Sequence, residues 1–182
     1  MRSSRTRHRL IGSFVGLAIL GQTAGVAAAG GSTHAEARII DGAGQAIGWA
    51  QLTEDAAGQL HMNVQVAGLT AGRHGIHLHA VGQCVGPTFA SAGGHHNPLG
   101  AEHGLDNPAG AHAGDLPNLV VNVAGRGHLD AVSHHATLSS GPLSLLDTDG
   151  SAIVIHAFED DQVTNPTGNS GARVACGVIE AT

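Results

Sequence analysis

The chain has 182 residues, of which 42% are hydrophobic and only 12% are charged, and its eight basic residues are all arginine. Four of these arginines and none of the 14 acidic residues lie before residue 30, so the chain from Gly30 onward carries a formal charge of −10. A domain of roughly 150 residues can bury one hydrophobic core, and such an acidic surface excludes nucleic acid and anionic lipid as natural partners.

The first 29 residues have the layout of a secretory signal peptide. Residues 1–9 form a basic leader, residues 10–20 are an apolar run, and residues 21–29 end in an Ala-x-Ala pattern. The apolar run is too short to span a bilayer. We therefore expect cleavage after Ala29 and export of a single domain, residues 30–182, to the periplasm or the extracellular space, with no membrane span in the mature form.

The mature chain then alternates short apolar runs with glycine-rich turns. Eight segments show the partial alternation of apolar and polar residues that half-buried strands require, namely 35–40, 46–54, 59–66, 73–80, 118–123, 128–138, 151–158 and 172–180. No segment of the mature chain shows the period of an amphipathic helix with caps. The pattern predicts an all-β domain built from antiparallel hairpins, and it leaves the choice between a sandwich and a closed barrel open.

Two segments lack this alternation of short apolar runs and glycine-rich turns. Residues 81–118 contain no strand-like run, and residues 157–172 form a shorter irregular stretch. A compact domain seldom carries a structureless loop of such length unless the loop has a function. A disordered insertion is the alternative, but it would be richer in charge and in low-complexity sequence. The potential metal ligands of residues 81–118 indicate instead a loop that a metal ion fixes in place.

The segment Gly-Ile-His-Leu-His at 75–79 begins the set of potential ligands. In a strand, His77 and His79 project from the same face, either as a polar patch toward water or as half of a metal site. Further donors follow in the loops and in a later strand: His95, His103, His112, Asp115 and His156. A set of imidazoles suits copper or zinc, and a mixed imidazole and carboxylate set suits zinc. These residues alone predict one or two transition-metal sites.

The chain contains two cysteines, Cys84 and Cys176, and both lie in the mature domain. In an exported protein an even number of cysteines favours a disulfide over two free thiols. Closing so long a loop stabilises the folded chain by roughly 4–5 kcal/mol in the chain-entropy description. We therefore expect a disulfide.

Several motifs together resemble one known family. The sequences GIHLH, GGHHNPLGAEHG, HAGDLPN, VIHAFEDD and GNSGARVACGVI occur in the order and approximate spacing of the copper/zinc superoxide dismutases, with Cys84 after the first of them. The match covers nearly the whole mature chain. It implies a Greek-key antiparallel β-sandwich or flattened barrel of about eight strands with two long functional loops. It also implies an enzyme that converts superoxide into molecular oxygen and hydrogen peroxide.

The resemblance assigns the ligands. One copper ion per subunit is implied, with the ligands His77, His79, His95 and His156. One zinc ion is implied as well, with the ligands His95, His103, His112 and Asp115. In the family the imidazolate of the shared histidine bridges the two metals, copper cycles between oxidation states, and zinc holds the loop and polarises the shared ring.

Further roles follow from the same resemblance. Asp160 matches a carboxylate that hydrogen-bonds one ligand of each metal, and Arg173 matches the arginine that attracts and orients the superoxide anion. His95 is implied to supply a proton to the product, and Cys84 and Cys176 match the family's disulfide. A homodimer is the family's usual state.

The chain departs from the family pattern at two positions. Pro166 stands where cytosolic members of the family carry a lysine that helps to draw superoxide in, and the chain contains no lysine. We therefore expect weaker or more local electrostatic steering. His96 stands where an aromatic residue is common, and we expect it and the other unassigned histidines to be surface or packing residues.

Two other functions compete with the enzyme. A dismutase-like module could buffer or deliver copper without turnover, and a secreted domain could use zinc only as a structural staple. The presence of all seven ligands and of Arg173 favours the enzyme over the first. The second would leave His77, His79 and His156 without a purpose.

Overall fold

The computed structural model describes residues 33–182, so the predicted leader and its cleavage point lie outside the described part of the chain. The ten strands of the fold are β1 (His34–Asp41), β2 (Ala46–Glu54), β3 (Leu60–Ala67), β4 (Gly72–His74), β5 (Ile76–His79), β6 (Leu119–Val121), β7 (Arg126–Ser133), β8 (Ala152–His156), β9 (Arg173–Val178) and β10 (Glu180–Ala181). All pair antiparallel. The prediction of an all-β fold is confirmed.

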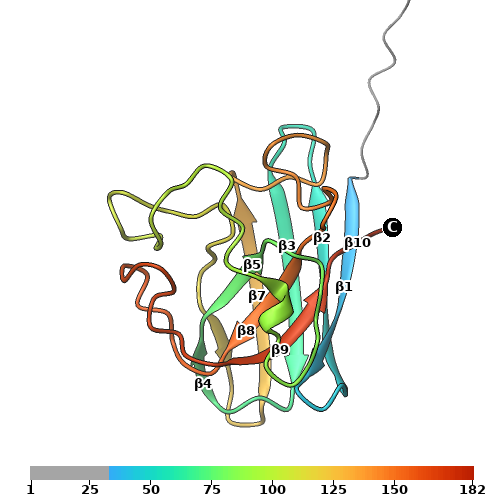
Figure 1. Cartoon of the computed structure of the whole chain (residues 1–182). Coiled ribbons are helices and arrows are strands. Elements are labelled where there is room, and N and C mark those ends of the chain that lie inside the picture. The colour runs from blue at the N-terminus through green and yellow to red at the C-terminus, as the bar shows by residue number, and fades with distance from the viewer. Residues whose placement is uncertain (1–32) are drawn as a thin grey trace, which may run out of the picture.

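The strands form one sheet that curls into a nearly closed barrel (Figure 1). Their order is β4-β6-β7-β3-β2-β1-β9-β8-β5, with β10 paired to β1. The first and last strands of this order, β4 and β5, are consecutive in the chain and are separated only by Gly75. Gly75 also accepts a hydrogen bond from the His156 amide at 2.8 Å, so the chain itself joins the two ends of the sheet.

The core lies inside this barrel because the strands alternate as the sequence pattern requires. In β3 the buried residues are Leu60, Met62, Val64 and Val66, and every second residue between them points outward. β7 shows the same alternation opposite β3. Fully burying one such aliphatic side chain stabilises the fold by roughly 1.5–3 kcal/mol, so the alternation decides which face of each strand turns inward.

Two predicted strands differ most from their sequence pattern. The segment 73–80 is divided at Gly75 into β4 and β5, which pair with different neighbours. The segment 128–138 leaves the sheet after Ser133. The cause is Glu54, whose carboxylate accepts hydrogen bonds from the backbone amides of Leu138 at 2.6 Å and Ser139 at 2.7 Å.

Both irregular segments extend to the left side of the barrel in Figure 1, whereas the first part of the long loop, drawn in green, runs across the front of the sheet. The long loop contains one short 3-10 helix, η1 (Ala90–Ala92). The loops touch each other where the His103 amide donates to Oδ1 of Asn165 at 3.0 Å and the Asp106 amide donates to the carbonyl of Gln162 at 3.0 Å. The predicted disulfide is present between Cys84 and Cys176 and ties the long loop to β9.

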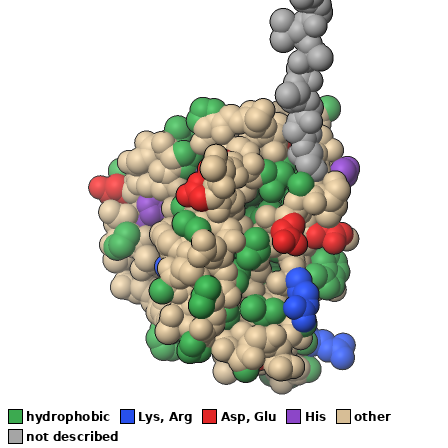
Figure 2. Space-filling view, turned by 45° about the vertical axis from the view of Figure 1, so that its right-hand side comes forward, with side chains coloured by type: hydrophobic (Ala, Val, Ile, Leu, Met, Phe, Trp, Pro, Cys, Tyr) green, Lys and Arg blue, Asp and Glu red, His purple; other side chains and the backbone are tan. Residues whose placement is uncertain are grey.

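Charged side chains are few, as the composition implies, and acidic ones outnumber basic ones in the described part of the chain. On the face shown in Figure 2, acidic, basic and hydrophobic side chains are scattered singly or in small groups. Within residues 33–182, no helix combines the length and the apolar character needed to cross a membrane.

Candidate metal centre

Strand β5 places two histidines on the outer wall of the barrel beneath the long loop. Ile76 and Leu78 point into the core, whereas His77 and His79 point the other way and are nevertheless buried, at 0% and 1% exposure. The loop covers them, because the Leu78 amide donates to the carbonyl of Gly114 at 2.9 Å and the Leu78 carbonyl accepts from the His96 amide at 2.8 Å. The reading of the pair as a patch facing water is therefore wrong.

Four imidazoles converge beneath this loop. His77, His79, His95 and His156 offer ligand atoms that all lie within 4.8 Å of one another. Within the described residues, Nδ1 of His77 and Nε2 of the other three are buried without a hydrogen-bond partner. A buried polar atom without a partner costs about 1–3 kcal/mol, and a cation held among these four atoms would satisfy all of them. We call these residues the first donor group.

The remaining nitrogen of each outer ring is anchored, which fixes its orientation. Nδ1 of His79 donates to the carbonyl of Gly93 at 3.0 Å, and Nδ1 of His156 donates to the carbonyl of Gly171 at 3.1 Å. Nε2 of His77 donates to Oδ2 of Asp160 at 2.6 Å. Because the anchored nitrogen carries the proton, the inward nitrogen presents its lone pair to the centre of the group.

The second donor group consists of His95, His103, His112 and Asp115. Nδ1 of the three histidines lies 3.0, 2.9 and 3.3 Å from Oδ1 of Asp115, and Nδ1 of His112 lies 3.2 Å from Nδ1 of His95. A tetrahedron with metal bonds of about 2.0–2.1 Å has edges of about 3.3 Å, which these separations approach. His95 belongs to both groups, through opposite nitrogens of one ring.

His77 also offers a ligand atom within 4.8 Å of those of His95, His103 and Asp115, because its ring stacks on that of His95 with centroids 3.9 Å apart. Its Nε2 is engaged by Asp160, and its Nδ1 is the unpartnered atom of the first group. His77 therefore completes the first group, and His112 completes the second.

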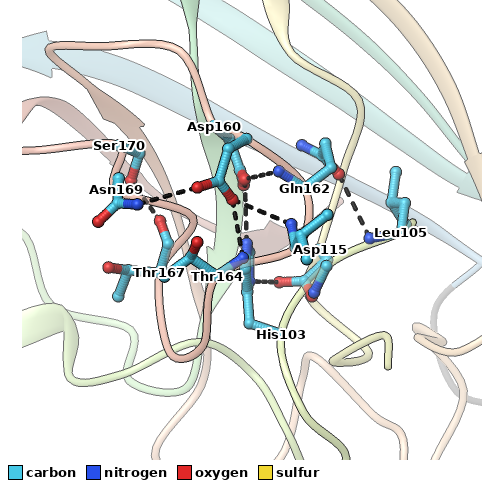
Figure 3. A network of polar contacts seen from close by, with 12 residues as sticks. His103, Leu105, Asp115, Asp160, Gln162, Thr164, Thr167, Asn169 and Ser170 are labelled. Atoms are coloured by element: carbon cyan, nitrogen blue, oxygen red, sulfur yellow. Dashed lines mark hydrogen bonds and ion pairs between the residues drawn. The ribbon is translucent and has the colours of Figure 1, made fainter. Parts of the chain in front are cut away.

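Asp160 connects the two groups (Figure 3). Its Oδ2 accepts from Nε2 of His77 at 2.6 Å, and its Oδ1 accepts from Nε2 of His103 at 3.0 Å. Asn118 holds this aspartate in place, since its Oδ1 accepts from the Asp160 amide and its Nδ2 donates to the Asp160 carbonyl, both at 2.8 Å. The sequence analysis did not identify Asn118, because its partner Asp160 is 42 residues away in the chain and no local pattern indicates the contact.

The electrostatics keep His77, His79 and His156 of the first donor group neutral. Burial lowers the pKa of His77 to about 3, that of His79 to about 2 and that of His156 to about 4. The positive charge of Arg173 contributes to the lowering of the pKa for the last two. At neutral pH these imidazoles hold no extra proton, and their inward lone pairs are available to a metal ion.

His103 shows the opposite behaviour. Burial by itself would lower its pKa, but hydrogen bonds from both ring nitrogens to Asp115 and Asp160 outweigh it and raise the pKa to about 9. The pKa of each carboxyl is held well below its usual range, because hydrogen bonds from His103 outweigh the effect of burial. Without a metal ion, the second group is thus a charged cluster in which protons take the place of a cation.

Arg173 lies at the edge of the first group. It is the strand partner of His156 across β8 and β9. Its guanidinium donates to the carbonyls of Phe89 at 2.6 Å and Gly93 at 2.5 Å. Both carbonyls belong to the loop that the Cys84–Cys176 disulfide ties to the same strand. The disulfide therefore holds the loop that holds the arginine.

All of the sequence-predicted site residues come together in this region, and His96 does not belong to either group. His96 lies within the long loop, is buried at 5% exposure and is a member of neither donor set. Besides Asn118, the sequence analysis missed Gly168, which lies against Asp160 and His103. A glycine within an irregular loop carries no sequence signal of such a contact.

Comparison with known proteins identifies relatives of this arrangement. The family model described as copper/zinc superoxide dismutase (SODC) matches residues 46–179. The chain is 42% identical over 144 residues to the superoxide dismutase-like protein YojM of Bacillus subtilis, covering 78% of this chain and 74% of that protein. It is also 42% identical over 147 residues to superoxide dismutase [Cu-Zn] 2 of Aquifex aeolicus, covering 80% and 85%.

The fold has solved counterparts as well. The crystal structure of a SOD-like protein from Bacillus subtilis superposes with a TM-score of 0.76 at 41% identity and covers 79% of this chain and 96% of that one. The similarity thus extends over nearly all of the described barrel and both of its loops.

Proposed function

Because this chain belongs to the copper/zinc superoxide dismutase family, whose enzymes use copper and zinc, we propose how its residues divide that chemistry. The first donor group binds copper through His77, His79, His95 and His156. The second binds zinc through His95, His103, His112 and Asp115. The enzyme converts two superoxide anions and two protons into molecular oxygen and hydrogen peroxide.

One observation carries this proposal: four buried imidazole nitrogens without partners converge at one point. An all-nitrogen set of this kind fits copper, whereas the mixed set around Asp115 fits the tetrahedral preference of zinc. The sharing of His95 through opposite ring nitrogens supports a bridging imidazolate between the two metals. Copper, when bound, supplies the redox chemistry, because it can accept one electron and return it.

The protein residues supply charge and protons. Arg173 offers a guanidinium beside His79 and His156, and its positive charge attracts the superoxide anion and orients it. Nε2 of His95 faces the first group and can hold a proton there, which it passes to the departing peroxide. Asp160 keeps His77 and His103 oriented, so the reacting geometry is maintained without side-chain rearrangement.

A second function deserves the same test, since one relative is named only superoxide dismutase-like. A module that buffers copper needs donors but no arginine at the open edge of the copper group. In this chain Arg173 is held against the first group by two loop carbonyls. A guanidinium fixed in this position favours an enzyme that converts superoxide over a module that only stores copper.

We also propose that residues 30–182 form the mature domain, exported to the periplasm or the extracellular space after removal of residues 1–29. The Cys84–Cys176 disulfide supports export, because such bonds persist in oxidising compartments. The homodimer stays a prediction from the family resemblance.

The proposal is tested by counting metals and measuring superoxide decay on the purified protein. We expect one copper and one zinc ion per chain, and decay of superoxide that depends on the copper. Full loading with both metals without faster superoxide decay would contradict the enzymatic function and favour the copper-buffering module. Zinc without copper would leave only the structural staple.

Zinc added alone to the metal-free protein is expected to release protons at neutral pH, whereas copper added alone is not, because the proton that a bridging His95 imidazolate must lose leaves only when the second metal binds. In the metal-free protein the pKa of His103 is raised to about 9, so Nδ1 must lose its proton before zinc can bind. Zinc affinity therefore rises with pH until about 9, with release of about one proton per ion. The outer copper ligands have pKa values of about 2–4 and are already neutral at pH 7.

Calorimetric titration in two buffers of different ionisation enthalpy measures this release. The variant Asp160→Asn is the matched control, since it removes one of the two carboxylates that raise the His103 pKa. Its zinc-linked proton release at pH 7.5 should be smaller. Equal numbers of protons released by zinc and by copper, each added alone to the unmodified metal-free protein, would contradict the assignment of the two groups.

A further inference from the structure

A cavity of about 200 Å³ leads from the surface to the second donor group. Its lining includes His112 and Asp115 of the second group, together with Ser133, His134 and His135 at the end of β7. The cavity therefore brings two histidines that the proposed metal centre does not use to the same space as two proposed zinc ligands.

His112 is the member of the second group that faces this cavity. Its Nδ1 points to the group, at 3.2 Å from Nδ1 of His95, and its side chain keeps 7% exposure while that of His103 is at 0%. Nε2 of His103 is held by Asp160 at 3.0 Å. Among residues 33–182 no hydrogen bond holds Nε2 of His112, and His112 is the one histidine of the second group that lines the cavity.

His134 and His135 are exposed and belong to the lining of this cavity. The backbone amide of His135 donates to Oγ of Ser133 at 3.2 Å, which fixes the turn that presents the two rings. Within the described part of the chain, neither ring has a hydrogen-bond or ion-pair partner. Two imidazoles without protein partners in the lining of one cavity offer nitrogen donors to a borderline-soft divalent ion.

We propose that His134 and His135 form a loading site for Zn²⁺, which holds the ion at the cavity and passes it to His112. This inference rests on the proposed zinc assignment of the second group. The acidic domain attracts divalent cations in general, and the imidazole pair concentrates those that accept nitrogen ligands. Transfer of the ion to the second group then requires movement of the His112 ring, which lines the cavity.

The rate of metal uptake by the metal-free protein tests the proposal, with Co²⁺ as the probe. Tetrahedral Co²⁺ absorbs visible light strongly, so absorbance after mixing follows filling of the second group. The double variant His134→Gln, His135→Gln should take up Co²⁺ about tenfold more slowly at limiting metal, with an unchanged final absorbance. The control His61→Gln, His128→Gln removes two other exposed histidines and should keep the original rate.

The possible results are distinct. Equal uptake rates in both double variants would overturn the loading site. A lower final absorbance at an unchanged rate would overturn it as well, because the pair would then contribute to the final site and not to its filling. If the unmodified protein gives no tetrahedral signal, the zinc assignment itself fails, and the loading site fails with it.

A second measurement examines the site directly. In protein whose two donor groups are already filled with copper and zinc, added Co²⁺ should broaden the imidazole NMR signals of His134 and His135 before those of His61 and His128. Equal broadening of all four rings would show that the cation binds exposed histidines without preference and would overturn the proposal.

Discussion

Replacing Gly168 by alanine is expected to lower the free energy of unfolding of the metal-free protein by about 3 kcal/mol and to weaken binding of both metals about 10- to 100-fold. An added Cβ at this position would overlap Oδ1 of Asp160 and lie 2.7 Å from Nε2 of His103. The backbone φ of +59° adds the strain of a left-handed conformation. Because Asp160 orients one ligand of each metal, its displacement reaches both donor groups.

The matched control is Gly58→Ala. Gly58 has a similar φ of +76°, but nothing lies within 4 Å of the added Cβ. This variant should lose only about 1 kcal/mol, the cost of the backbone conformation, and should keep both metals. Denaturant titration of the metal-free proteins and metal competition with a chelator measure the two effects. Equal losses in both variants would mean that loop 157–172 yields to the added atom without moving Asp160.

Arg173→Ala is expected to leave both metals bound and to lower the second-order rate constant for superoxide about tenfold or more. Within residues 33–182 the guanidinium donates hydrogen bonds to the carbonyls of Phe89 and Gly93 and to no proposed ligand side chain, so its loss spares the donor set. The Gly93 carbonyl keeps its hydrogen bond from His79. The rate falls because the positive charge beside the copper group is gone.

Two further variants separate charge from anchoring. Arg173→Lys keeps the charge but cannot reach both carbonyls in the same way, so it should recover part of the rate. Arg38→Ala removes one exposed positive charge from β1 and should leave the rate unchanged. Rates measured from low to high salt check the cause, since the effect of Arg173→Ala should shrink as salt screens the charge. Loss of copper from Arg173→Ala would contradict this role.

The alternation of apolar residues was sufficient to predict the sheet, because burial of one strand face dominates the energetics of β2, β3 and β7. It could not predict where strands break. The run 73–80 has no interruption in its pattern, and only pairing of its two halves with β6 and β8 reveals Gly75 as a corner. The strand end at Ser133 depends on Glu54, a residue about 80 positions away in the chain.

The site followed the same division. The spacing of His77 and His79 was sufficient to predict them as a pair of potential ligands, because one strand presents both on the same face. The partition of donors between two metals came from the family resemblance, since spacing cannot say which nitrogen of His95 faces which group. Asn118, Gly168 and the cavity at His134 depend on how two loops lie against each other, and no local pattern records that contact.

The hydrogen bonds of Leu78 have a consequence for how the folded protein behaves in concentrated solution. β5 is the last strand of the sheet order, and an uncovered terminal strand offers its backbone to neighbouring molecules as a template for pairing. Here the amide and the carbonyl of Leu78 are both taken by the loop at Gly114 and His96. The same segment that carries the zinc donors thus guards the protein against strand-to-strand aggregation, and solubility depends on keeping that loop in place.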